Sequence, residues 1–228
     1  MQKLEVFGAN KLKGQIKISG SKNSSLPILA ATLLSKKKII IKNLPRVKDI
    51  YTMISLLQSL GSSIKYSDKT VQIDNSNQIK KIATYNLVKT MRAGILVLGP
   101  LLAKFGYAKV SFPGGCAIGT RPVDFHLDAL AKLGAKIELK NGYIEATAKK
   151  LIGCDISFPG VSVTGTENIM MAAVLARGQT VLRNVAKEPE VEDLANFLNS
   201  MGAKIKGAGS DEIVIDGVDN LNGTKFSI

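Results

Sequence analysis

One short phrase occurs three times along the chain and decides the fold: Leu60-Gly61-Ser62-Ser63-Ile64, Leu133-Gly134-Ala135-Lys136-Ile137 and Met201-Gly202-Ala203-Lys204-Ile205. In each copy the glycine follows an amphipathic pattern of helical period, over about residues 47–60, 122–133 and 190–201. Glycine directly after the last apolar residue is the usual C-terminal cap of a helix. Two strand-like segments joined by a turn follow each glycine, and the turns are Ser67-Asp68-Lys69, Lys140-Asn141-Gly142 and Ala208-Gly209-Ser210-Asp211.

A second helical run precedes each amphipathic one, and a strand-like stretch lies between the two. These runs are apolar nearly all round and rich in small residues, which is typical of fully buried helices; they cover residues 25–34, 90–103 and 167–176. The sequence therefore predicts a mixed α and β fold, an inside-out α/β barrel-like domain of three repeated helix-strand-helix-strand-strand units with buried central helices. The alternative, an ordinary doubly wound sheet, requires amphipathic helices that lie on the surface.

Both ends of the chain depart from the repeat. Residues 1–20 predict a pair of strands, at 3–7 and 14–18, outside a main domain of residues 21–228. Residues 225–228 look like the start of a strand with nothing after it. We therefore expect something to be missing at the C-terminus, and we expect the strand edges of the first 20 residues to recruit other strands, such as those of a second copy of the chain.

Composition excludes several classes of protein. Of 228 residues 45% are hydrophobic, which is ample for a core, whereas two cysteines and one histidine are too few for a disulfide scaffold or a zinc site. We expect neither a metal nor another cofactor. The longest apolar runs are about half of the ~20 residues that cross a bilayer, and the N-terminus lacks a signal-peptide core. These features predict a cytoplasmic protein that does not bind membranes.

The formal net charge of +13 indicates an anionic partner, either a nucleic acid or a small molecule. The lysines are dispersed along the chain, and only 5% of the residues are aromatic. Proteins that bind single-stranded nucleic acids need aromatic platforms on which bases stack. We therefore expect small anionic substrates and no nucleic acid.

Three helix starts carry candidate anion-binding residues. The segment 20–25 offers capping hydroxyls and Lys22 at a helix N-terminus, which suits a phosphate or carboxylate, although a capped, solvated turn is the commoner reason for such residues. Residues 160–168 open the third buried helix with several hydroxyls and amides. Arg92 opens the second, and in a chain with five arginines and 26 lysines an arginine marks a site of defined geometry, either a bound anion or an internal salt bridge.

The loop of residues 112–124 is the richest segment. It has three glycines within six residues and holds Cys116 between them, where the thiol can reach solvent. Pro122 suits the first position of a helix, which leaves Arg121 at the helix entrance, where a cationic environment would lower the pKa of the thiol. The residues alone leave it open whether Cys116 is reactive. Cys154 lies in a strand-like pattern and is expected to be structural, and His126 is expected to be packed or on the surface.

Taken together, these motifs resemble the UDP-N-acetylglucosamine 1-carboxyvinyltransferase family of enolpyruvyl transferases. The matching segments, in order and spacing, are Ser21-Lys22-Asn23, Met91-Arg92-Ala93, residues 113–124 and Glu188-Pro189-Glu190-Val191-Glu192-Asp193. The resemblance implies transfer of enolpyruvate from phosphoenolpyruvate to the 3-hydroxyl of UDP-N-acetylglucosamine. Phosphate is released, a tetrahedral intermediate is formed and no metal takes part. This reaction is the first step of peptidoglycan synthesis.

The resemblance also implies roles for single residues. Cys116 matches the general acid in the addition of phosphoenolpyruvate, which the inhibitor fosfomycin alkylates, and Lys22 and Arg121 match cations that hold phosphoenolpyruvate. The implied contacts with the nucleotide sugar are Asn23, Arg92, Pro122, Val123, Asp124, Phe125, Ser162 and Val163.

The chain departs from the family pattern at two positions and in its extent. Phe125 stands where leucine is usual, and Thr164-Gly165-Thr166 stands where Gly-Ala-Thr is usual, so that a side chain replaces a glycine near the implied diphosphate contact. Family members have two similar domains, and the resemblance implies that the second domain is missing here. Residues 1–20 resemble the segment that in the family packs with the second domain, to which the general base, an aspartate, also belongs. A non-catalytic UDP-sugar-binding module and an RNA-binding repeat protein are the alternative hypotheses.

Overall fold

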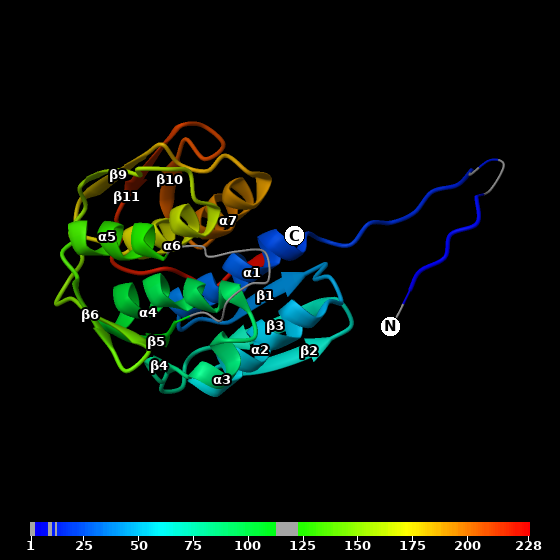
Figure 1. Ribbon diagram of the computed structural model, residues 1–228, viewed down its shortest axis with the longest axis horizontal. Helices are drawn as coiled ribbons and strands as arrows, with labels where there is room; N and C mark the ends of the chain where they lie inside the picture. Colours follow the sequence, from blue (N-terminus) through cyan, green and yellow to red (C-terminus); the bar gives the residue numbers. More distant parts are fainter. Residues whose placement is uncertain (1–2, 9–10, 12, 113–122) are drawn as a thin grey trace.

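The computed structural model describes residues 3–8, 11, 13–112 and 123–228. It confirms the mixed α and β class: three separate four-stranded sheets lie on the outside, with helices between them (Figure 1). Three separate sheets exclude the doubly wound alternative, which has one. The three cores merge into one hydrophobic cluster.

Each unit contains the succession helix, strand, helix, strand, strand, and in the second and third units a short strand precedes it. The first comprises α1 (Lys22–Ala31) with the 3₁₀ turn η1 (Thr32–Leu34), β1 (Ile39–Lys42), α2 (Lys48–Leu60), β2 (Ser63–Ser67) and β3 (Thr70–Asp74). The second comprises β4 (Ile82–Ala83), α3 (Tyr85–Val88), η2 (Arg92–Val97), α4 (Leu98–Phe105), β5 (Tyr107–Ser111), α5 (Asp124–Lys132), β6 (Lys136–Lys140) and β7 (Tyr143–Thr147). The third comprises β8 (Asp155–Ser157), α6 (Val163–Ala173), β9 (Gln179–Arg183), α7 (Pro189–Ser200), β10 (Lys204–Lys206) and β11 (Glu212–Asp216), and β12 (Lys225–Ser227) ends the chain.

The sheets share one internal order. In each, three antiparallel strands, of which the last in sequence lies in the middle, gain a short parallel edge strand, giving the orders β12-β1-β3-β2, β4-β5-β7-β6 and β8-β9-β11-β10. The end of the chain thus supplies the fourth strand of the first sheet, where Ile40 pairs with Lys225. Phe226 of β12 also packs edge to face on the buried Phe197 of α7, with ring centroids 5.4 Å apart. The first and third units are therefore joined through the C-terminus.

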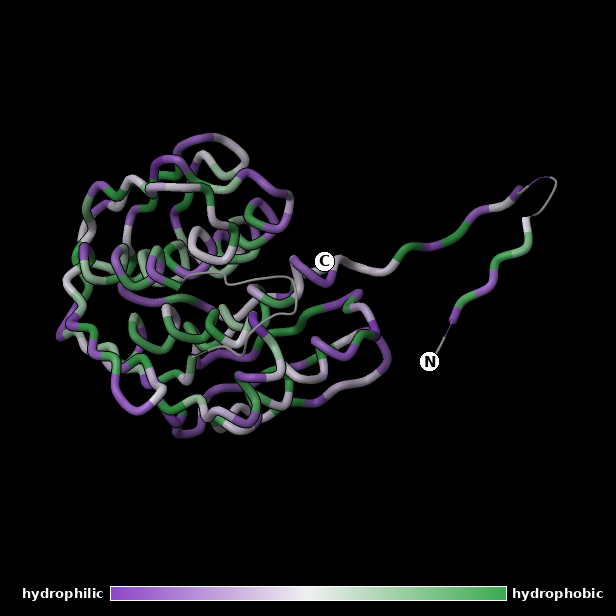
Figure 2. The backbone as a smooth tube through the Cα atoms, viewed as in Figure 1, coloured by the Kyte–Doolittle hydropathy of each residue, from purple (hydrophilic) through white to green (hydrophobic). Residues whose placement is uncertain are grey.

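Burial separates the two kinds of helix, as the patterns predict. Every residue of α1 from Ser24 onward and every residue of α6 from Gly165 onward is buried. The tube in Figure 2 shows these apolar stretches running through the body. The run at 90–103 is not one helix: it divides into η2 and α4, and Pro100 lies in the first turn of α4, where the missing N–H of proline costs no hydrogen bond.

The predicted strands at 3–7 and 14–18 are not found. The described residues before Gly20 form neither helix nor strand, and they lead away from the body (Figure 1). Five large apolar side chains on them are highly exposed: Leu4 by 89%, Val6 by 80%, Phe7 by 88%, Ile16 by 90% and Ile18 by 77%. The alternating pattern is that of a strand, but a strand also needs a neighbour with which its backbone can pair, and the described segments have none.

Candidate active site

A cleft of about 810 Å³ opens where the N-termini of α1 and α6 and the start of η2 meet. Its wall combines cations, carboxylates and apolar side chains. The polar and charged lining residues are Lys22, Asn23, Asp49, Lys89, Thr90, Arg92, Ser162, Thr164, Glu167 and Glu190. The mixture of donors and acceptors suits a polar ligand that carries negative charge.

At the start of α1, Ser21 caps the helix: its Oγ accepts a hydrogen bond from the Ser24 N–H at 3.3 Å. This cap sets Lys22 at the first helical position, where its Nζ lies 3.4 Å from Asp49 Oδ2. Both side chains are nearly half-exposed, so the ion pair contributes little to stability and an anionic ligand can displace it. Asn23 Nδ2 donates to Glu190 Oε1 at 3.1 Å, which ties α1 to the first turn of α7.

The start of α6 is built in the same way. Ser162 is the N-cap, and its Oγ accepts from the Gly165 N–H at 3.2 Å. A Cβ at Gly165 would lie 2.9 Å from that Oγ, so glycine there leaves room for the cap. The N–H groups of Val163 and Thr164 come first in the helix and have no intrahelical acceptor. This end of α6 carries partial positive charge and favours an anion.

Two buried titratable groups lie at or behind the wall. Glu167 is 2% exposed, and its burial, together with the charges of Glu190 and Glu188, raises the pKa of its carboxyl well above the ordinary value. His126 is also 2% exposed, and burial, assisted by the charge of Arg92, lowers its pKa to about 4. His126 is therefore neutral near pH 7, and the proton of Glu167 is held more tightly than that of a solvated carboxyl.

The cleft brings together six of the residues singled out in the sequence: Lys22, Asn23, Arg92, Phe125, Ser162 and Val163. Two others do not line it, since Val123 is buried beneath the start of α5 and Asp124 is exposed there. Cys116, Arg121 and Pro122 lie outside the described residues, and their roles stay predictions.

Sequence reasoning gave no role to Asp49, Lys89, Glu167 or Glu190. Glu167 could have been noticed in the sequence, because it is a carboxylate at the start of an otherwise apolar run of buried helix.

The expected strand position of Cys154 is wrong, because β8 begins one residue later. Its Sγ donates to Lys132 O at 3.4 Å, and burial raises the pKa of the thiol.

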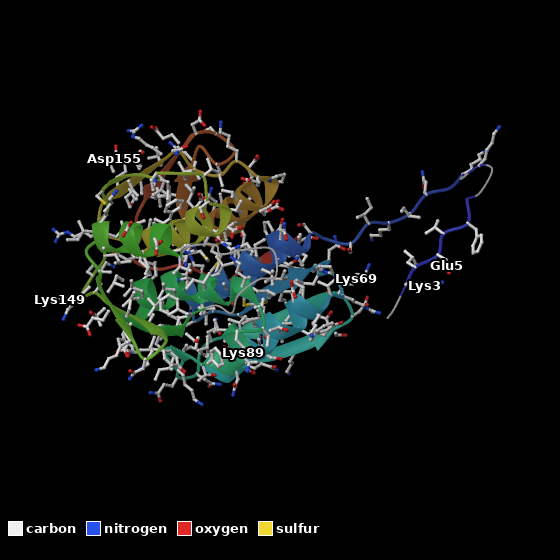
Figure 3. All side chains as sticks on the ribbon, in the orientation of Figure 1. Lys3, Glu5, Lys69, Lys89, Lys149 and Asp155 are labelled. Carbon is white, nitrogen blue, oxygen red and sulfur yellow. The ribbon has the colours of Figure 1, made fainter. Side chains whose placement is uncertain are left out.

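Over the ranges that the structure describes, no group of three or more His, Cys, Asp and Glu side chains is arranged to hold a metal ion. None of the helices described there has the length and apolar character needed to cross a membrane. Charged side chains of both signs cover the outside of the body (Figure 3).

Residues 6–228 match the model of one protein family, described as EPSP synthase (3-phosphoshikimate 1-carboxyvinyltransferase). The chain belongs to the EPSP synthase family. Relatives include UDP-N-acetylglucosamine 1-carboxyvinyltransferases from Pelagibacter ubique, 64% identical over 229 residues, and from Hydrogenovibrio crunogenus, 53% identical over 229 residues. Each alignment covers 100% of this chain and 55% of the relative, so this EPSP synthase family member spans about half the length of the curated relatives it matches.

Solved structures show the EPSP synthase family fold. The enolpyruvyl transferase NikO from Streptomyces tendae superimposes with a TM-score of 0.81 at 22% identity, over 97% of this chain and 52% of that chain. EPSP synthase from Acinetobacter baumannii superimposes with a TM-score of 0.76 at 19% identity, over 94% of this chain and 49% of that chain. At such low identity these matches bear on the fold alone.

Proposed function

We propose that the chain forms the nucleotide-sugar-binding half of a UDP-N-acetylglucosamine 1-carboxyvinyltransferase, acting in the cytoplasm in peptidoglycan synthesis. The observation that carries the proposal is the convergence of two capped helix N-termini with Lys22 and Arg92 on one cleft. Both substrates, phosphoenolpyruvate and UDP-N-acetylglucosamine, are anions that such groups bind well. The names of the relatives at 64% and 53% identity agree with this assignment.

The proposed roles are those that the resemblance to the family implies, and six of the residues concerned line the cleft. Lys22, with Arg121, holds phosphoenolpyruvate; Asn23 and Arg92 bind the nucleotide sugar; and Phe125 offers a flat face to the uracil. Ser162 and Val163 bind the diphosphate at the start of α6. Pro122, Val123 and Asp124 are assigned to the uridine by resemblance, and Cys116 is assigned as the general acid and the target of fosfomycin.

In the proposed reaction, the general base takes the proton of the sugar 3-hydroxyl as its oxygen forms a bond to C2 of phosphoenolpyruvate, and the Cys116 thiol gives its proton to C3. The bond from C2 to the phosphate oxygen then breaks and phosphate leaves, while C3 returns a proton to the Cys116 thiolate, which restores the double bond. Lys22 and Arg121 stabilise the negative charge of the phosphate as it leaves. The general base belongs to the second half that family members have.

Two structural predictions belong to the same proposal. The shared order of the three sheets supports an inside-out barrel-like arrangement about a pseudo-threefold axis. The exposed apolar side chains of residues 3–8 and 13–20 support a role for this segment in packing with a second domain.

Calorimetric titration of the 228-residue chain with UDP-N-acetylglucosamine tests the proposal. We expect saturable binding that weakens about tenfold in Arg92→Lys, which keeps the charge but loses the bidentate fork, and stays unchanged in Lys149→Ala, an exposed lysine outside the cleft. Failure of the wild-type chain to bind would refute the assignment. Tight, salt-sensitive RNA binding instead would favour the nucleic-acid hypothesis.

A further inference from the structure

A chain of hydrogen bonds runs from the core to the cleft through Asn168, His126 and Thr164. At its inner end, Asn168 Oδ1 accepts from the Gly99 N–H at 2.7 Å, and Asn168 Nδ2 donates to Ile95 O at 3.0 Å. These two hydrogen bonds to the backbone therefore fix the orientation of the Asn168 side-chain amide, with Oδ1 toward Gly99 and Nδ2 toward Ile95. A Cβ at Gly99 would lie 2.4 Å from Asn168 Oδ1, so only glycine permits this close approach.

The fixed amide determines the tautomer of His126. The second hydrogen of Asn168 Nδ2 points to His126 Nδ1, 3.0 Å away, so Nδ1 is an acceptor. His126 is 2% exposed, and the low pKa that burial gives it keeps the ring neutral. A neutral imidazole carries one N–H, which must then be on Nε2.

This tautomer in turn orients the Thr164 hydroxyl. His126 Nε2 lies 3.3 Å from Thr164 Oγ1 and donates to it. The hydroxyl keeps one proton of its own to donate elsewhere, and Thr164 lines the cleft. It is the second residue of α6, next to the first backbone N–H groups of that helix.

We propose that Thr164 binds substrate, its hydroxyl donating a hydrogen bond to a phosphate oxygen of the nucleoside diphosphate, and that His126 and Asn168 are positioning residues that direct this hydroxyl into the cleft. The inference rests on the proposed function, which supplies the nucleoside diphosphate. The Thr164 side chain thus adds a contact to the site.

Glu167, one turn further along α6, lines the same cleft at 2% exposure. The elevated pKa of its carboxyl reduces the negative charge that a phosphate meets there. The start of α6 therefore presents hydrogen-bond donors to an anion with less opposing charge from its own helix than a carboxyl of ordinary pKa would give.

The test compares Thr164→Val, which keeps the shape and removes the hydroxyl, with Thr164→Ser, which keeps the hydroxyl. We expect the Val variant of the 228-residue chain to bind UDP-N-acetylglucosamine about tenfold more weakly, as for a lost hydrogen bond to a charged group, and the Ser variant to bind within about threefold of wild type. Uridine, which has no phosphate, should bind both variants as it binds wild type. If Thr164→Val binds UDP-N-acetylglucosamine as tightly as wild type does, the inference is overturned and the proposed function is not. If the wild-type chain does not bind it at all, both are overturned. If Thr164→Val weakens the binding of uridine as much as that of UDP-N-acetylglucosamine, the inference is also overturned, because the substitution has then changed the shape of the site.

A double-mutant cycle tests the positioning role. His126→Gln can place an N–H near Nε2, whereas His126→Asn keeps a polar group toward Asn168 and cannot reach Thr164. We expect His126→Asn to weaken binding about threefold in the wild-type background and not at all in the Thr164→Val background, with His126→Gln close to wild type. A loss that persists in the Thr164→Val background would mean that His126 acts by another route and would overturn its assignment. If the His126 variants do not fold, the two Thr164 variants still decide the substrate contact.

Discussion

Glu167 is a buried side chain whose carboxyl lowers the stability of the folded protein. Its carboxyl is 2% exposed within α6, and its neighbours Glu188 and Glu190 carry the same charge. Removing a charged carboxylate from water is costly, so the protonated form is favoured in the folded state. Such a residue in a cleft wall is more often kept for function than for stability.

Glu167→Gln should therefore stabilise the unliganded protein, and more so as the pH rises. Because the pKa is raised in the folded state, that state binds more protons than the unfolded chain above about pH 4.5, and wild type loses stability as the pH rises through the folded pKa. The melting temperature of the variant should exceed that of wild type at pH 8 by at least about 2 °C, with a smaller gap at pH 5. Asp219→Asn, at an exposed position, is the control. A gap that is constant or shrinks with pH would contradict the expectation.

The two cysteines should differ in reactivity. Burial raises the pKa of the Cys154 thiol and lowers its thiolate fraction, whereas the sequence places Cys116 between glycines and near Arg121. Iodoacetamide should label Cys116 first under native conditions, as followed by mass spectrometry of the digested protein. Equal or faster labelling of Cys154 would show the assignment to be wrong.

At the scale of elements, the three-residue strand β12 connects several parts of the fold. It gives β1 a parallel partner, Asn43 Nδ2 donates to Ile228 O at 2.8 Å, and Phe226 packs on Phe197. These contacts connect the first sheet with the last amphipathic helix.

Phe226→Ala should lower the free energy of unfolding by about 1–3 kcal/mol, because a half-buried ring and an aromatic pair are lost. Phe7→Ala is the matched control: Phe7 is 88% exposed, and its loss should stay within about 0.5 kcal/mol. Urea denaturation measures both. Equal losses would mean that β12 does not anchor the sheet.

Element boundaries could be predicted where one residue sets them locally. Gly61, Gly134 and Gly202 take φ of 111°, 93° and 101°, the left-handed values that end the amphipathic helices. Of the three parallel edge strands, β12 and β8 fall on or beside stretches that the sequence marks as strand-like, whereas the two-residue strand β4 could not be predicted. The pairing of each edge strand could not be predicted either, because it is defined by a partner distant in the sequence. The cleft residues on α1, η2 and α6 could be selected in the sequence because of their chemistry. The roles of Asp49 and Glu190 could not be predicted, because they depend on which helices lie next to each other in the fold.

At the scale of the whole molecule, the proposed function places one half of the active site in this chain, which spans about half the length of the curated relatives it matches. The 228-residue chain alone should release phosphate from phosphoenolpyruvate at least about 10⁴-fold more slowly than an enzyme with the second half. Loss of a general base costs about 10²–10⁴ and loss of one electrostatic donor about 10²–10³ in rate. Phosphate release measured with a Cys116→Ala control checks this. Turnover near the common enzymatic rate of about 10 per second that vanishes in the control would show that this half suffices.

The pairing of β1 with β12 also has a consequence for synthesis on the ribosome. Ile40 and Lys225 are neighbours in the sheet but lie 185 residues apart in the chain. At a translation rate of about 5–20 residues per second, roughly 10–40 s pass between the emergence of the two strands. For that time one edge of β1 has no partner, and its apolar Ile39-Ile40-Ile41 segment is open to pairing with other chains, which binding of a chaperone would prevent.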